Sequence, residues 1–392
     1  MTTPVTLSIQ NFAQIRDARL SFGDLTVLVG AQGTGKSLAL QWLKVALDGK
    51  HIVGALQEAG YLSTPVRNRA KTRPDPGFLV DLIFGTGMGN AWDPEKSVVK
   101  YDQQSIRPES FQKQGGENER AFFIPAHRSL LITDGWAAPF HRLSPDTPIV
   151  ARLFSQNLFN RFSSRDSGAL FPQHRVLKSS YRKLIDEAVF HGGKVAFEED
   201  QHHAKRLSLA HGEMRLPFMT WTAGQREFTP LLLGLYHLLP ERKQSKLPGI
   251  DWVIIEEPEM GLHPQAISVV MLLVLDLMWR GYRVVLATHS PYVLEAVWML
   301  RQLQQLDAKW SLVCRAFGVP NKDMRPVAEA VLKKDYRVHY FSYGEDGKVE
   351  SKDISSLDPD HEDDDVSGWG GLSEFSTRFG KAVRLAVEAK GM

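Results

Sequence analysis

The sequence predicts an α/β fold with a mixed, largely parallel sheet, an N-terminal β-hairpin region and an inserted helical lobe. Three observations support this prediction. Apolar runs typical of buried strands recur along the chain, a segment with helical spacing separates two of them, and two polar segments interrupt the series. Strand, helix and strand in that order form the parallel unit of α/β sheets.

Three strands and a helix are expected in residues 1–48. "TLSIQNF" alternates between apolar and polar residues, "ARLSF" follows a turn at "QIRD", and "LTVLV" is apolar on both faces. The helix comes next, because "KSLALQWLKVAL" places Leu40, Leu43 and Leu47 on one side.

Three further strands complete the predicted core. They are "AFFIPA" from Ala121, "DWVIIEE" from Asp251 and "RVVLATHS" from Arg283. Between the last two, "PQAISVVMLLVLDLMWRG" predicts a helix, with Pro264 in its first turn and Gly281 just past its end.

Two segments do not fit this sheet, and we expect them to be insertions. One is rich in Pro, Gly and polar residues, and the other combines a helical pattern, "SSYRKLIDEAVF", with short strand-like runs. The tail reads as a small α/β piece, with "DYRVHYFSY" as a strand and "EFSTRFGKAVRLAVEAK" as a helix. The expected division is core at 1–48, 121–128 and 220–307, insertions at 49–120 and 129–219, and the C-terminal piece at 308–392.

Composition narrows the class of protein. Hydrophobic residues make up 43% and charged residues 23% of the 392 residues, as in soluble globular proteins. The single cysteine, Cys314, excludes an internal disulfide framework and fits a reducing cytosol. We expect a cytoplasmic protein without a signal peptide or membrane partner, because the longest apolar run is too short for a bilayer and carries Asp276. With a net charge of +2, any contact with DNA needs a local basic patch.

A phosphate-binding loop is predicted at "GAQGTGKS", which fits the pattern G-x-x-x-x-G-K-[ST] in full. The glycines let backbone N–H groups point at the phosphates, and the following helix adds its positive end. A buried strand before the loop and a helix after it argue against a chance match. The predicted nucleotide-binding residues are Gly30, Gly33, Thr34, Gly35, Lys36 and Ser37, with Lys36 reaching the β- and γ-phosphates and Ser37 binding Mg²⁺.

Two glutamates end the predicted strand before the helix that contains Pro264, and a histidine ends the strand after it. Ligands of open α/β sheets lie at the carboxyl ends of strands, so Glu256 and Glu257 are expected to face the phosphates. Adjacent side chains diverge, which suits Glu256 as a Mg²⁺ ligand and Glu257 as the group that positions or deprotonates the attacking water. His289, in "ATHSP", can donate a hydrogen bond to a γ-phosphate oxygen. The alternatives are a solvated strand end and a structural histidine.

The order of these motifs resembles that of an ABC-type ATPase of the SMC/RecF-like branch. It is most similar to the overcoming-lysogenisation-defect (OLD) family and related antiphage-defence ATPases. The resemblance rests on the phosphate loop, "TAGQRE", "IIEEPEMGLHP" and "ATHSP" in that order. It implies ATP and Mg²⁺ as cofactors and two heads that clamp two ATP molecules head to tail. The residues that would contact the partner's nucleotide are Thr222, Ala223, Gly224 and Gln225; alone, they would be a turn before a helix.

The sequence departs from the family at one motif. The glutamine of the Q-loop is not evident, and "FFIPAHR" occupies the corresponding strand end. His127 is therefore expected near the metal or the water, while Arg128 could equally be structural. Asn11 and Arg16 could touch the nucleotide from the first hairpin or form a plain surface turn. His263, after Glu257, would lie near the partner.

The resemblance also implies a function. OLD-family members carry a Toprim nuclease domain after the ATPase, but only about a hundred residues follow His289 here. We therefore expect an ATPase that acts as sensor or scaffold for a separate effector, a nuclease, in antiphage defence. The alternative is a DNA repair or recombination ATPase that clamps duplex DNA, with "RNRAKTR" at 67–73 contacting phosphates. The long insertions disfavour a transporter subunit. "DPDHEDDD" and "EEDQHHAKR" could hold a metal ion, but we interpret both as solvated surface segments.

Overall fold

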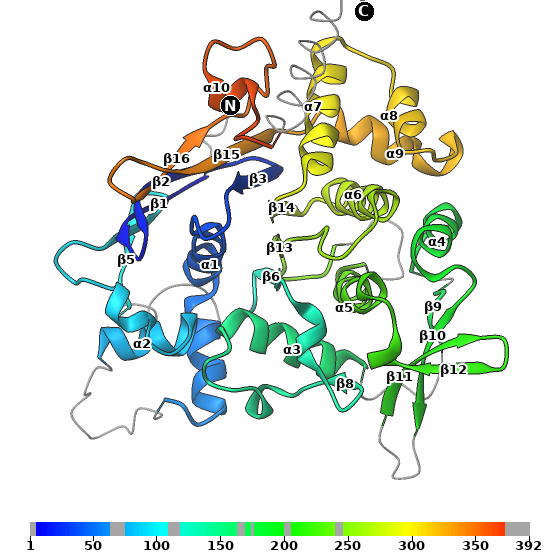
Figure 1. Cartoon of the computed structure of the whole chain (residues 1–392), viewed down its shortest axis with the longest axis horizontal. Helices are drawn as coiled ribbons and strands as arrows, with labels where there is room; N and C mark the ends of the chain where they lie inside the picture. The colour runs from blue at the N-terminus through cyan, green and yellow to red at the C-terminus, as the bar shows by residue number, and fades with distance from the viewer. Residues whose placement is uncertain are drawn as a thin grey trace, which may run out of the picture.

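A ten-stranded sheet forms the centre of the computed structural model, which describes residues 5–62, 75–108, 118–162, 169–173, 176–199, 205–239 and 246–372. The strand order is β5-β4-β1-β2-β16-β15-β3-β14-β13-β6 (Figure 1). The strands are β1 (Val5–Phe12), β2 (Ile15–Phe22), β3 (Leu25–Gly30), β4 (Val98–Tyr101), β5 (Gln104–Ile106), β6 (Ala121–Ile124), β13 (Trp252–Glu256), β14 (Arg283–Ala287), β15 (Tyr336–Tyr343) and β16 (Val349–Asp353). Strands β15, β3, β14, β13 and β6 are parallel, which confirms the predicted mixed α/β sheet.

Helices cover both faces of the parallel strands, with α1 on one face and α5 and α6 on the other. The described α-helices are α1 (Lys36–Glu58), α2 (Pro76–Phe84), α3 (Ile149–Phe162), α4 (Ser179–Ile185), α5 (Ala223–Leu238), α6 (Pro264–Trp279), α7 (Pro291–Gln305), α8 (Ser311–Ala316), α9 (Asn321–Val331) and α10 (Asp364–Ser367). Alternate residues of β13 face opposite cores: Ile254 packs with α1, and Val253 and Ile255 pack with α5 and α6. No described helix combines the length and apolar character needed to cross a bilayer.

Helix α1 runs further than the sequence predicts. Instead of ending near residue 47 it continues to Glu58, with a kink at Asp48, whose φ of −129° and ψ of 24° are not helical. The buried Asp48 carboxylate accepts hydrogen bonds from the backbone N–H groups of Arg120 (2.8 Å) and Ala121 (3.0 Å). The kink therefore ties α1 to the start of β6.

The expectation that residues 49–120 lie outside the sheet is wrong. Strands β4 and β5 fall in the segment expected to be an insertion outside the sheet, yet β4 pairs with β1, from Leu7 opposite Tyr101 to Gln10 opposite Val98. The strand expected at "DYRVHYFSY" is present as β15, and it lies inside the main sheet between β16 and β3. The first hairpin also turns at residues 13–14, so most of the expected "QIRD" turn belongs to β2. The predicted helix at 374–390 lies outside the described residues.

The segment 129–219 is more than helical. Besides α3 and α4 it contains a second sheet of strand order β12-β11-β10-β9. These strands are β9 (Ala169–Phe171), β10 (Lys194–Glu199), β11 (Lys205–His211) and β12 (Met214–Pro217). A separate two-stranded sheet is formed by β7 (Ile132–Thr133) and β8 (Trp136–Ala137). The expected helix "SSYRKLIDEAVF" is present as α4 followed by a π-helical turn, Asp186–Phe190.

Candidate nucleotide site

The phosphate loop joins β3 to α1 at the carboxyl end of the sheet. Its three glycines, Gly30, Gly33 and Gly35, have φ values of 142°, 76° and 88°. A Cβ atom on Gly30 would lie 2.2 Å from the carbonyl oxygen of Phe341 on the neighbouring β15. Only glycine allows the loop to leave the sheet there.

Lys36 lies inside this loop. Its Nζ donates to the carbonyl oxygens of Gly30 and Ala31, both at 2.8 Å, and lies 3.4 Å from the Thr34 hydroxyl. Burial lowers the pKa of Lys36 to about 8, against the opposing attraction of Glu257 and Glu259. The ammonium group is thus already within the electrostatic reach of the acids that follow β13.

Glu256, the last residue of β13, is buried beside the loop. Its Oε2 accepts a hydrogen bond of 3.1 Å from the N–H of Ala126, and its Oε1 has no hydrogen-bond partner among the described residues. Burial raises the pKa of Glu256 to about 7, while the Ala126 N–H and the Ser37 hydroxyl oppose that shift. A buried carboxylate oxygen without a partner, next to a hydroxyl, fits a hard divalent cation such as Mg²⁺.

Glu257 turns away from the line of β13. Its φ of 40° is in the left-handed region, which costs a non-glycine residue about 1 kcal/mol or more. Its N–H donates to Ala287 on β14 at 2.8 Å. Its Oε1 lies 4.0 Å from Nε2 of His289. The structure thus brings Glu257 and His289 together in front of the phosphate loop.

Arg128 is buried behind both glutamates, a contact that the sequence left open. Its Nη1 donates to the carbonyl oxygen of Glu256 (2.9 Å) and its Nη2 to that of Glu257 (3.2 Å). Its Nε donates to the carbonyl oxygen of Glu227 on α5 at 3.3 Å.

His127 is exposed with a φ of 48°, and no hydrogen bond joins its ring to Ser37 or Glu256 in the described part of the chain. The backbone of Ala126 reaches Glu256 in its place.

Glu259 is a site residue that the sequence reading missed. Its Oε1 accepts hydrogen bonds from the Thr288 hydroxyl (2.6 Å) and from the N–H of His289 (2.7 Å), so it orients the end of β14. The third acid of "EEPE" was the available signal. Burial, with a contribution from Lys36, lowers the pKa of His289, which is therefore neutral near pH 7.

Two hairpin tips hold the phosphate loop from the other side. The Gln14 amide (2.6 Å) and the Tyr343 hydroxyl (3.0 Å) both donate to the carbonyl oxygen of Gly33. Asn11 and Arg16, which the sequence left open between nucleotide contact and a surface turn, are engaged elsewhere. Arg16 pairs with Asp346 and Glu350, and the Asn11 amide donates to Lys96.

The expected signature residues begin α5. Thr222 and Gln225 form a capping box, with Gln225 N–H donating to the Thr222 hydroxyl at 3.3 Å, and the Gln225 amide also donates to Val189 at 3.1 Å. Thr222 and Ala223 are exposed, and a Cβ on Gly224 would lie 2.9 Å from the Gly261 carbonyl oxygen. Among the described contacts, none joins these residues to the phosphate loop of the same chain.

The acidic segments considered as metal sites are not assembled as such. No group of three or more His, Cys, Asp or Glu residues in the described ranges has a metal-binding arrangement. In "DPDHEDDD", Asp363 caps α10 and pairs with Lys352. His202 and His203 lie outside the described residues, as does the basic run at 67–73.

A phosphate loop between a buried strand and a helix, faced by acids at the end of a parallel strand, defines a P-loop nucleotide-binding protein. The sequence model of the family described as "AAA domain, putative AbiEii toxin, Type IV TA system" matches residues 25–295. The chain belongs to this family and is an AAA-type ATPase.

Individual known proteins are also similar to the chain. The Old nuclease of Escherichia phage P2 is 24% identical over 348 residues, which cover 74% of this chain and 57% of that protein. The chain thus spans somewhat over half the length of the curated relative it matches, and the resemblance to the OLD family is confirmed. Among solved structures, an SMC head bound to the C-winged helix domain of ScpA has 12% identity and a TM-score of 0.43, covering 89% of this chain and 96% of that one. The SMC head domain from Thermotoga maritima has 11% identity and a TM-score of 0.38, covering 90% and 99%.

Proposed function

We propose that the chain binds ATP with Mg²⁺ and hydrolyses it, with Lys36 on the phosphates and Glu257 as the base. The observation that carries this proposal is the buried carboxylate of Glu256, whose unpaired Oε1 lies beside the phosphate loop. Ser37 and Glu256 would hold the ion, which supplies positive charge next to the phosphate oxygens.

The chain's own groups divide the remaining work. Lys36, with a pKa of about 8, carries its positive charge at neutral pH and donates to phosphate oxygens. The Glu257 carboxylate lies beside His289 while that of Glu256 accepts from Ala126, so one acid can bind the ion while the other accepts a proton from water. Neutral His289, whose Nε2 lies 4.0 Å from Glu257 Oε1, would donate a hydrogen bond to a γ-phosphate oxygen beside Glu257.

Turnover in this proposal needs two chains that face each other head to tail. The exposed Thr222 and Ala223, at the N-terminus of α5, support it, because backbone N–H groups and the helix dipole there favour an anion. Gln225 fits less simply, since its side chain already bonds to Thr222 and Val189. Contact with a partner's nucleotide would have to replace one of these bonds.

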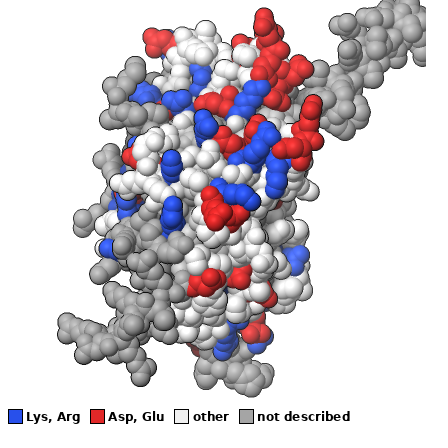
Figure 2. Space-filling view, turned by 90° about the vertical axis from the view of Figure 1, so that its left-hand side faces the viewer, with Lys and Arg blue, Asp and Glu red and all other residues white. Residues whose placement is uncertain are grey.

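We infer that the ATPase serves as sensor or scaffold for a separate nuclease in antiphage defence. Support comes from the similarity to the Old nuclease of Escherichia phage P2. The alternative, a clamp on duplex DNA, needs a basic patch. Figure 2 shows Lys and Arg side chains intermingled with Asp and Glu over the face on the left of Figure 1, so the described residues of that face form no uniform basic patch.

Equilibrium binding of ATP and release of phosphate test the catalytic proposal directly. Wild-type protein should bind MgATP and release phosphate, whereas Lys36→Ala should lose binding because no cation remains in the loop. Lys183→Ala, at an exposed position, is the matched control and should behave as wild type. Wild-type protein that binds no nucleotide would refute the proposal.

A tagged pull-down from the native host with ATP present, followed by native mass measurement, tests the effector. A stoichiometric nuclease in a multi-headed assembly supports the sensor proposal. A bare dimer that retains DNA through salt-sensitive contacts favours the clamp.

A further inference from the structure

Tyr343 ends β15 beside the phosphate loop. Strand β15 runs parallel to β3, with Phe341 opposite Gly30, so Tyr343 lies two residues further, level with the start of the loop. Side chains two residues apart on a strand share a face, and Phe341 packs into the core that contains α1. Tyr343 therefore lies on the side of the sheet where α1 begins.

The ring of Tyr343 is half exposed even though its hydroxyl is fixed. Its exposed fraction is 50%, one of the larger values for an apolar or aromatic side chain among the described residues. The hydroxyl donates to the Gly33 carbonyl oxygen at 3.0 Å. About half of the surface of this aromatic residue is thus in solvent at the edge of a phosphate-binding loop.

The segment that carries Tyr343 is anchored at both ends. At the tip, Arg16 donates to Asp346 and to Glu350, each at 2.8 Å, and the N–H of Val349 donates to Gln14 at 2.8 Å. These contacts bind the β15–β16 tip to the β1–β2 tip. The ring is therefore preorganised and loses little freedom on binding.

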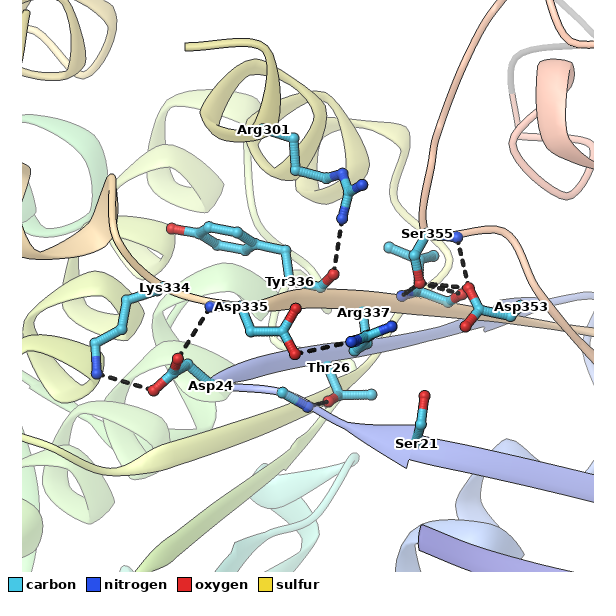
Figure 3. A network of polar contacts seen from close by, with 12 residues as sticks. Ser21, Asp24, Thr26, Arg301, Lys334, Asp335, Tyr336, Arg337, Asp353 and Ser355 are labelled. Carbon is cyan, nitrogen blue, oxygen red and sulfur yellow. Dashed lines mark hydrogen bonds and ion pairs between the residues drawn. The ribbon is translucent and has the colours of Figure 1, made fainter. Parts of the chain in front are cut away.

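The other end of β15 is fixed by a polar network (Figure 3). The Asp24 carboxylate, just before β3, accepts from Lys334 Nζ and from the N–H of Asp335, both at 2.9 Å. Arg337 donates to Asp335 at 3.0 Å. This network sets the register of β15 against β3, and with it the position of Tyr343 relative to the loop.

We propose that the exposed face of Tyr343 is the platform on which the base of the bound nucleoside triphosphate stacks. The proposal rests on the proposed nucleotide binding and adds the residue that meets the base. Every base presents a π-face, so stacking on Tyr343 raises affinity without selecting adenine over guanine. The competing explanation is that the hydroxyl merely pins the loop.

Binding of three probes separates these explanations: MgATP, MgGTP and magnesium tripolyphosphate, which lacks a base. Tyr343→Ala should weaken ATP and GTP binding by about 5- to 150-fold and leave tripolyphosphate binding unchanged. Tyr343→Phe keeps the ring, so its affinity for ATP should stay within about 3-fold of wild type. Phe78→Ala, at an aromatic residue of similar exposure (47%) on α2, is the matched control and should change nothing.

Two results would overturn the proposal. One is equal weakening of ATP and tripolyphosphate by Tyr343→Ala; the other is a loss in Tyr343→Phe as large as in Tyr343→Ala. Either would assign Tyr343 to pinning the loop. Tyr343→Leu, which keeps apolar volume without a π-face, replaces the alanine variant if that variant unfolds. Failure of nucleotide binding itself is recognised separately, because wild-type protein would then bind none of the three probes.

Discussion

Arg128 donates a hydrogen bond of 3.2 Å to the carbonyl oxygen of Glu257. The same guanidinium group binds the carbonyl oxygens of Glu256 and Pro125, and its Nε reaches that of Glu227 on α5. A fully buried charge from the turn that follows β6 thus holds the backbone of both acids and of α5, which begins at Ala223. The left-handed conformation of Glu257 persists because this surrounding structure fixes it.

Replacing Arg128 by lysine should slow ATP turnover more than it weakens ATP binding. Lysine keeps the charge, but its single ammonium group cannot reach all four of these carbonyl oxygens, so Glu257 loses its fixed position. Loss of one hydrogen bond to a charged group, about 1.5–3 kcal/mol, corresponds to a decrease in kcat of about 10- to 150-fold. The affinity for ATP should change by less than about 3-fold, since Arg128 makes no contact with the phosphate loop among the described residues.

Arg152→Lys is the control for this experiment. Arg152 is equally buried but donates to Leu82 and packs against the rings of Tyr61 and Phe140, away from the strand ends. The Arg152→Lys substitution should lower the free energy of unfolding, while the kcat of the folded protein should stay the same. If Arg128→Lys changes only stability, Arg128 has no positioning role.

The base assignment predicts a separable defect in Glu257→Gln. The amide cannot accept a proton, so phosphate release should fall by about 10²- to 10⁴-fold. ATP binding should persist, and native mass measurement should find a dimer trapped with ATP. Glu295→Gln, at an exposed position on α7, is the control. Hydrolysis at the wild-type rate in Glu257→Gln would assign the base to another residue.

The parts of the site predicted from the sequence are those carried by contiguous motifs. The pattern G-x-x-x-x-G-K-[ST] specifies the backbone of the phosphate loop from Gly30 to Ser37. Glu256 is the last residue of β13, a strand that its apolar run predicts. Strands β3, β6, β13 and β14 were predictable for the same reason, since each is apolar on both faces. Their roles in binding and catalysis stay predictions until the variants are measured.

The contacts that the sequence did not predict join distant segments. Tyr343 meets Gly33 only because β15 enters the sheet beside β3, and no local pattern specifies that neighbour. Strand β5 has three residues, too few for alternation to stand out from a loop. His127 illustrates the opposite error: its position after β6 suggested a ligand, but a φ of 48° and an exposed ring leave the backbone of Ala126 to reach Glu256.

The Glu256 carboxyl predicts a pH dependence of stability. Burial raises its pKa from 4.5 to about 7, so the folded state binds this proton more tightly than the unfolded chain does. Its contribution is fully present below pH 4.5 and is lost as the pH rises through about 7. The free energy of unfolding should therefore fall by up to about 3 kcal/mol across this window.

Urea unfolding of the nucleotide-free protein at pH 5, 6, 7 and 8 measures this slope. Glu256→Gln should remove it, and Glu295→Gln, at an exposed residue of α7, should keep it. His289 acts in the opposite direction, because its lowered pKa makes stability rise with pH through its titration. That contribution is common to wild type and variant, so it cancels in their difference. Parallel curves for wild type and Glu256→Gln would contradict the raised pKa.

A buried ion cluster around Lys44 lies beside the kink of α1, and replacing Lys44 tests how strongly the kink depends on this cluster. Its side chain has no exposed surface, and its Nζ lies 2.7 Å from Asp48 and 2.6 Å from both Glu119 and the Ala121 carbonyl oxygen. Burial lowers the pKa of Lys44, but the two carboxylates outweigh this effect and raise it overall. The ammonium group therefore stays charged and joins α1 to the start of β6.

Lys44→Met should lower the free energy of unfolding by about 3–5 kcal/mol, because two carboxylates would remain buried without their cation. Lys183→Met, at a side chain that is 75% exposed, should change it by no more than about 0.5 kcal/mol. Denaturant titrations of both variants at pH 7 give the comparison. An unchanged midpoint in Lys44→Met would mean that Asp48 is satisfied by the N–H groups of Arg120 and Ala121 alone. The kink would then be held by backbone hydrogen bonds rather than by the buried charge.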